Sequence, residues 1–196
     1  MGRDGDRVRR TGTMTRIRRA VTVTGQAGTM TGERVDRDRD RAGRPRNARP
    51  RDGLGRPLDR TASGEPTTPD ELHLAPGDAL ALAQDLIDAG RPFHAHEVLE
   101  LVWKSAPADE RDLWQGLAQL AVGLTHARRG NGRGAVALLR RGAAPLDALM
   151  DGGPHGLDAV GTRRAALELA DRIEQAGLAS VPEADLRLRL IVRLIG

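Results

Sequence analysis

The chain has 196 residues, of which 30% are charged and 2% aromatic, and it contains no cysteine. The lack of cysteine excludes a disulfide scaffold, a thiol nucleophile and a zinc site built from thiolates. No apolar stretch approaches the ~18 residues that would indicate a membrane span.

The charge is divided unevenly along the chain. Residues 1–75 contain 17 Arg and 11 acidic residues, whereas residues 76–196 contain 14 basic and 16 acidic residues. The first segment shows no hydrophobic periodicity, so it cannot bury enough apolar surface to offset the entropy of ordering. Residues 1–75 are therefore predicted to be a disordered tail. Its composition changes at Met30, where we expect translation to start.

One part of the tail has a different pattern. The segment 44–58 contains three Pro, and Leu54 and Leu58 are spaced to dock on a folded surface. We interpret this segment as an extended linker, with docking as the alternative. The tail interleaves Asp with its Arg and has no aromatic residue, which argues against nucleic-acid binding.

From residue 76 onward, apolar residues recur with helical spacing between short Gly/Pro boundaries. No segment shows the alternation that we would assign to a strand. The domain 76–196 is therefore predicted to be all-α, a compact bundle of about five to six antiparallel helices. Pro145 is expected to bend the fourth of them. The helices are expected over residues 76–89, 92–105, 108–129, 132–150, 157–176 and 182–194.

Two of the expected hairpins share a weak repeat. A Gly followed five residues later by an Ala, between two helices, resembles a tetratricopeptide hairpin. That repeat normally has ~34 residues and needs at least three copies, so two packed hairpins are the simpler interpretation. A protein-interaction module stays open as an alternative. At a spacing of 40, Leu80, Ala81, Gly90, Ala95 and Leu99 match Leu120, Ala121, Gly130, Ala135 and Leu139.

The expected third helix carries no charged residue from Leu113 to Ala127. An exposed face in this Arg-rich chain would carry Arg or Glu, so both sides of the helix are expected to be covered. Gly116 and Gly123 each cost about 1 kcal/mol of helix stability, and a closely packed neighbouring helix is expected to compensate. One side carries four Leu, and the opposite side carries Gln115, Gln119, Val122 and His126.

The expected second helix carries the other unusual polar group. His96 and Glu100 are four residues apart, so both side chains can reach a common point, whereas His94 points away from His96. If the second and third helices face each other, a polar cluster forms between them. The candidate site residues are His96, Glu97, Glu100, Trp103, Gln115, Gln119, His126 and Asn131.

Three interpretations of this cluster compete. In the first, the residues form a buried hydrogen-bond network, since buried polar groups must be satisfied. In the second, His96, Glu100 and His126 bind a divalent metal such as Zn, Mn or Fe, and the protein is a metal-dependent hydrolase. In the third, His96 or Glu100 is a general base in a small-molecule pocket.

These motifs resemble domain-of-unknown-function family 309, a small all-helical bacterial and archaeal domain. The resemblance covers residues 78–150 and rests on the order of its motifs: 93–100 (FHAHEVLE) with Trp103, 115–121 (QGLAQLA), His126 and 130–135 (GNGRGA). It implies a compact helical fold in the cytoplasm and names no activity. His94 departs from the family pattern, in which an acidic residue usually stands there.

We therefore expect a soluble cytoplasmic helical bundle that binds a protein partner or a small ligand between its second and third helices. An enzymatic role is not the leading interpretation. The expected last helix is apolar at Leu186, Leu190 and Leu194. Such a face needs a cover, which either the chain's own bundle or a second copy of the chain can supply.

Overall fold

The computed structural model describes residues 49–59, 61–65, 74–149 and 153–191. All of them belong to one unit, residues 47–196. The predicted tail before residue 49, with its expected start at Met30, lies outside the described residues. So do Met150, Leu194 and Ile195.

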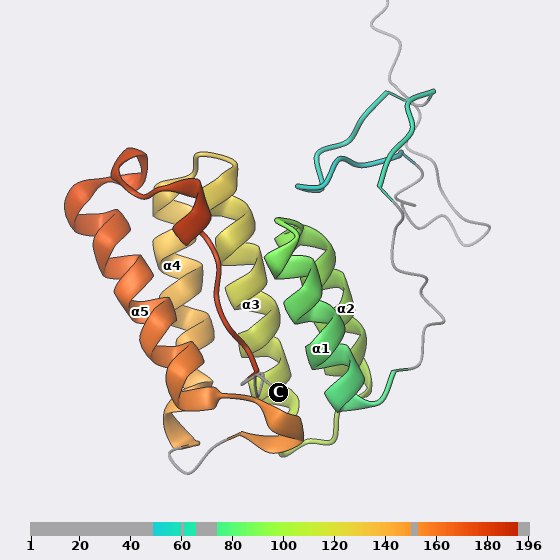
Figure 1. Cartoon of the computed structure of the whole chain (residues 1–196). Coiled ribbons are helices and arrows are strands. Elements are labelled where there is room, and N and C mark those ends of the chain that lie inside the picture. The colour runs from blue at the N-terminus through green and yellow to red at the C-terminus, as the bar shows by residue number, and fades with distance from the viewer. Residues whose placement is uncertain (1–48, 60, 66–73, 150–152, 192–196) are drawn as a thin grey trace, which may run out of the picture. The chain divides into compact units, whose positions relative to one another are not determined.

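The described part of the chain contains five α-helices and no multi-residue strand, which confirms the all-α prediction (Figure 1). No helix in this part combines the length and the apolar character needed to cross a membrane. The helices are α1 (Pro76–Asp88), α2 (Pro92–Ser105), α3 (Arg111–Arg128), α4 (Gly132–Ala143) and α5 (Ala159–Ala176).

Most predicted helix ends agree with the structure. Gly90, Gly130 and Gly177 each follow a helix with a positive φ of 75°, 83° and 80°. Glycine adopts this conformation without steric cost, which is why it stops helices so often. The predicted fourth helix is shorter than expected. It ends at Ala143, and a 3₁₀ turn, Ala144–Ala148, carries the chain past Pro145.

Each helix packs mainly against its neighbours in the sequence, and α3 lies between α2 and α4 (Figure 1). The prediction of a central third helix is thus confirmed. The glycines of α3 permit a close approach to α4. A Cβ on Gly116 would lie 2.8 Å from the carbonyl oxygen of Gly142, and a Cβ on Gly142 would lie 2.6 Å from that of Gly116. Backbone contact between the two helices is the expected compensation.

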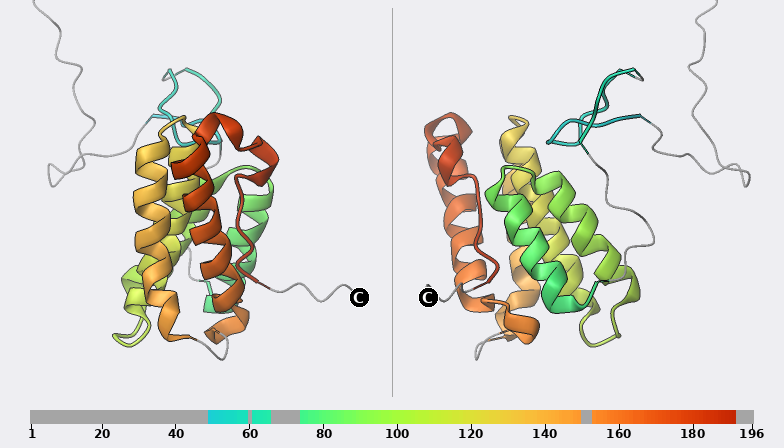
Figure 2. Two further views of the ribbon diagram at one scale, coloured as in Figure 1. Left: turned by 90° about the vertical axis from the view of Figure 1, so that its left-hand side faces the viewer. Right: turned by 45° about the vertical axis from the view of Figure 1, so that its right-hand side comes forward.

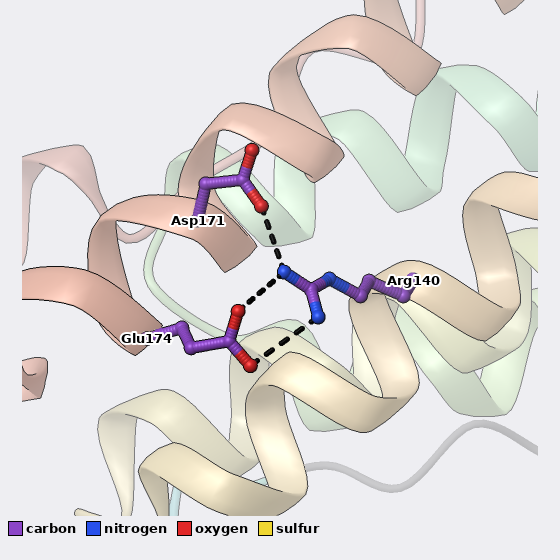
Figure 3. A network of polar contacts seen from close by, with 3 residues as sticks. All are labelled: Arg140, Asp171 and Glu174. Atoms are coloured by element: carbon purple, nitrogen blue, oxygen red, sulfur yellow. Dashed lines mark hydrogen bonds and ion pairs between the residues drawn. The ribbon is translucent and has the colours of Figure 1, made fainter.

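An ion-pair network joins α4 to α5 at the surface (Figure 3). Arg140 on α4 lies 2.8 Å from Asp171 and 2.6 Å from Glu174, both on α5. All three side chains are about half exposed, so water screens these pairs. These pairs are therefore expected to contribute little to the stability of the fold.

The predicted sixth helix is wrong. After a short 3₁₀ turn, Glu183–Asp185, the chain runs extended between α5 and α1 (Figures 1 and 2). Leu186, Leu188 and Leu190 are buried in the chain's own core. These three Leu side chains therefore do not need a second copy of the chain to cover them, and oligomerisation stays a prediction.

Hydrogen bonds with α1 and α5 explain the extended conformation. The buried Gln84 side chain on α1 donates to the carbonyl of Leu188 at 3.2 Å and accepts from the N–H of Leu190 at 2.6 Å. On the other side, the Thr162 hydroxyl donates to the carbonyl of Arg189 at 2.7 Å. These bonds satisfy backbone groups that a helix would satisfy internally. The segment 186–191 thus lies between α1 and α5 and is bonded to both helices.

Candidate functional site

The polar side chains expected to meet between the second and third helices lie in three separate places. His96 and Glu100 lie on α2, and His126 and Asn131 lie where α3 turns into α4. Gln115 and Gln119 of α3 line a cavity beside the 3₁₀ turn Ala144–Ala148. The residues lining that cavity come from α3, from the turn before it, from the end of α4 and from the chain after α4, and none comes from α2. The structure therefore does not assemble the predicted cluster.

The α2 group is a row of three titratable side chains, each one helical turn from the next. His96 Nε2 lies 3.5 Å from Glu100 Oε2, and Lys104 Nζ lies 3.1 Å from Glu100 Oε1. Burial lowers the pKa of His96, and the Glu100 carboxylate only partly opposes this effect. The imidazole is thus held towards its neutral form, beside a carboxylate whose charge is shared with Lys104.

The other predicted residues of α2 surround this row. Trp103 is partly buried and packs against the core, whereas Glu97 is half-buried. The Phe93 ring lies 6.0 Å from the His96 ring. This side of α2 is a mixed polar and aromatic surface.

At the α3–α4 corner, His126 and Asn131 have a structural role. The Asn131 side-chain nitrogen lies 2.8 Å from His126 Nδ1, and its side-chain oxygen accepts from the N–H of Gly134 at 2.9 Å. Asn131 is thereby the N-cap of α4, the position where Asn is strongly favoured. The corner is therefore held by local capping.

The three predicted metal ligands do not come together. Among the described residues, no group of three or more His, Asp or Glu side chains is arranged to hold a metal ion. His96 and Glu100 meet because they are one turn apart on the same helix, whereas His126 is turned towards Asn131. A metal at His96, Glu100 and His126 stays a prediction that this geometry does not favour.

The predicted Gln115 and Gln119 line a cavity of about 770 Å³. We call it the Gln cavity. Both side chains are half-buried on the side of α3 that faces the 3₁₀ turn Ala144–Ala148. The other lining residues are Asp109, Glu110, Asp112, Leu113, Gly116, Arg141, Ala144, Pro145, Asp147, Ala148, Leu149 and Pro154.

A carboxylate–imidazole pair stands at the edge of the Gln cavity. His155 Nε2 lies 3.0 Å from both carboxylate oxygens of Glu110, and the Trp114 indole N–H donates to Glu110 at 3.0 Å. These bonds, Trp114 first and His155 second, lower the pKa of Glu110. The carboxylate is therefore kept ionised and fixed in orientation.

Sequence reasoning missed this pair. Glu110 and Trp114 are four residues apart, a spacing that allows contact on one helix face, but His155 lies in a Gly/Pro loop far along the chain. His155 adopts a positive φ of 58°, which is uncommon for a residue other than Gly. Only the folded loop shows that this conformation places the ring against Trp114, at 6.0 Å between ring centroids.

Known proteins match the central part of the chain. Residues 80–138 match the model of the family described as "Domain of unknown function (DUF309)", which confirms the resemblance over that stretch. Over 57 residues the chain is 44% identical to the protein described as "Uncharacterized protein YpuF" of Bacillus subtilis (strain 168). The alignment covers 29% of this chain and 33% of that relative, so the chain spans about a third of the relative's length. No solved structure matches.

Proposed function

Since residues 80–138 match the DUF309 family model, which names no activity, we propose that the protein is a ligand-binding domain and that its site is the Gln cavity. The observation that carries the proposal is the cavity itself. Its volume of about 770 Å³ lies within the range of small-molecule sites in proteins. The matched family segment contributes the wall formed by α3.

The lining supports a small organic ligand. Leu113, Pro145, Leu149 and Pro154 supply apolar surface, and the Gln115 and Gln119 amides supply both donors and acceptors. A few convergent polar groups on an apolar wall are typical of such sites. The cavity is thus suited to a molecule with an apolar body and one polar end.

Charge favours an amine at that polar end. Four lining residues are acidic and one, Arg141, is basic. Asp147 is partly neutralised by Arg163 at 2.7 Å, and Glu110 shares its charge with His155 and Trp114. Asp109 and Asp112 remain at the rim, where they attract a cation. The ligand class is therefore a small organic amine.

A library of small amines, screened by ligand-observed NMR on the full chain, tests the proposal. Compounds that bind the wild type are expected to lose their saturation-transfer signal in Gln119→Ala. Gln175→Ala is the matched control, because Gln175 is an exposed amide on α5. Binding that survives Gln119→Ala and Gln115→Ala, or that fails in the Gln175→Ala control, contradicts the assignment.

A further inference from the structure

A second cavity lies between α4 and α5, two helices that run side by side (Figure 1). Its volume is about 670 Å³, which is within the range of small-molecule sites in proteins. We call it the α4–α5 groove. It shares none of its described lining residues with the Gln cavity, so a ligand in one does not depend on a ligand in the other.

The floor of the α4–α5 groove is apolar. Val136 comes from α4, Ile173 from α5, and Leu178 from the 3₁₀ turn Leu178–Ser180 that follows α5. Ile173 is part of the buried core, and the other two pack against it, so the floor is held in place. Ala137, beside Val136, is exposed and carries only a methyl group, which leaves room above this floor.

Two charged residues that line the groove are already paired with each other. Arg140 lies 2.6 Å from Glu174, and it also lies 2.8 Å from Asp171 (Figure 3). Two carboxylates against one guanidinium leave this network with one negative charge in excess. The network therefore does not attract an anion into its part of the groove.

Arg133 differs from Arg140 because its charge is not balanced. Within the part of the chain that the structure describes, its exposed side chain forms no ion pair or hydrogen bond. Arg133 and Arg140 are seven residues apart on α4, which separates them by about 10 Å along the helix. Val136 and Ala137 lie between them, so the groove has a cationic end, an apolar middle and an end with excess negative charge.

From this arrangement we propose that the α4–α5 groove binds a small carboxylic acid with an apolar body. The carboxylate pairs with Arg133, because a guanidinium fork matches the two oxygens of a carboxylate. The apolar body covers Val136 and Ile173, and the area removed from water favours binding. The excess negative charge of the Arg140 network repels a carboxylate, so the ligand lies with its charged end at Arg133.

Amide NMR of the isotope-labelled full chain tests the proposal, with hexanoate as the probe. Acetate has the same charge without the apolar body, and hexylammonium has the body with the opposite charge. Hexanoate is expected to shift the signals of Gly132 and Gly177, which line the groove, in a saturable way. Acetate and hexylammonium should have no such effect at the same concentration. An equal response to hexylammonium, or no saturable response to hexanoate, overturns the proposal.

Two substitutions separate the charge from the apolar floor. Arg133→Gln should weaken hexanoate binding about 5-fold at low salt, as expected when an exposed ion pair is lost. Ala137→Leu fills the space above the floor and should weaken binding at low and high salt alike. Both positions are exposed, so both variants are expected to fold. Arg164→Gln is the matched control, since Arg164 lies exposed on α5 outside the groove, and it should bind like the wild type. Unchanged affinity in Arg133→Gln or in Ala137→Leu overturns the proposal.

The oligomeric state distinguishes a small ligand from a second copy of the chain as the occupant. Size-exclusion chromatography with light scattering measures it for the wild type and for Ala137→Leu. A monomer, or a dimer that survives Ala137→Leu, leaves the groove free for the acid and supports the proposal. A dimer that Ala137→Leu dissociates shows that a second copy covers the groove and overturns it.

Discussion

The two hairpins, α1–α2 and α3–α4, share a buried skeleton and differ in their polar positions. Residues 40 apart, such as Leu80 and Leu120 or Leu99 and Leu139, are buried in both hairpins. Position 84 breaks this correspondence. Gln84 binds the backbone of the extended segment, whereas its counterpart, Leu124, is a core residue. The positions that repeat are therefore the packed apolar ones. The polar residues differ because each hairpin contacts different neighbours.

The outer faces of the hairpins show the same rule. Arg140 on α4 pairs with two carboxylates on α5 (Figure 3), whereas its counterpart Glu100 pairs with His96 and Lys104 on its own helix. Among the described helices, only α1 and α3 pack extensively against α2. The face of α2 that corresponds to the α5-covered face of α4 is thus left without a covering helix.

The largest effect is expected from the shared skeleton. Leu99→Ala and Leu139→Ala each remove a fully buried side chain and should lower the free energy of unfolding by about 2–5 kcal/mol. Urea denaturation followed by Trp fluorescence measures both. A much smaller loss for one of them would show that the two hairpins are not equivalent in packing.

Gln84→Leu gives the first hairpin the residue type that the second has at Leu124. It should lower the free energy of unfolding by less than the Leu→Ala changes do. The change leaves the carbonyl of Leu188 and the N–H of Leu190 without their partner. A buried polar group left unsatisfied costs about 1–3 kcal/mol. Amide hydrogen exchange should show faster exchange at Leu190 than in the wild type. Unchanged exchange there would mean that the segment 186–191 is held by its leucines alone.

His94 gives the α1–α2 hairpin a pH dependence that its counterpart, Gly134, cannot give the other. Since burial lowers the His94 pKa in the fold, the unfolded chain binds a proton more readily. Stability is therefore fully present above the unfolded value of about 6.5 and falls as pH decreases below it. His94→Leu should reduce the loss of stability between pH 7.5 and pH 5.5, measured by urea denaturation. An equal loss in both proteins would assign it to other groups, His96 first.

The smallest effect is expected at the surface pairs. Arg140→Ala should cost at most about 1 kcal/mol, because its partners are half exposed and screened by salt. Glu100→Ala should cost no more. The thermal midpoints of both variants, measured at low and high salt, check this expectation. A loss in Arg140→Ala that persists at high salt would show that the network stabilises the α4–α5 contact directly.

Local rules predicted the helices because their periodicity and their Gly stops act within a few residues. The last segment was missed because Leu186 and Leu190 are spaced for a helix and, together with Leu188, also alternate as in a strand. Hydrogen bonds from Gln84, more than a hundred residues away, decide between the two. Such a tertiary contact overrides local propensity and leaves no short-range signal.

The same distinction applies to the candidate site. The contact between His96 and Glu100 was predictable because one helical turn fixes it. The direction in which Gln115 and Gln119 point depends on the rotation of α3 relative to its neighbours, which sequence spacing does not determine. His94 is likewise buried where residues 51–57 dock on the helices. Neither the sequence of those residues nor that of α2 alone indicates this contact.

The extended segment 186–191 also determines which step of folding comes last during synthesis. Residues 186–191 leave the ribosome after all five helices, yet Gln84 in the first helix obtains its two backbone partners only from them. A nascent chain that carries every helix but not this segment lacks the two backbone partners of the Gln84 side chain. The docking of residues 186–191 therefore resembles the binding of a peptide that is tethered to the helices. Because more than a hundred residues separate this segment from Gln84, the cost of closing that loop makes docking a late step.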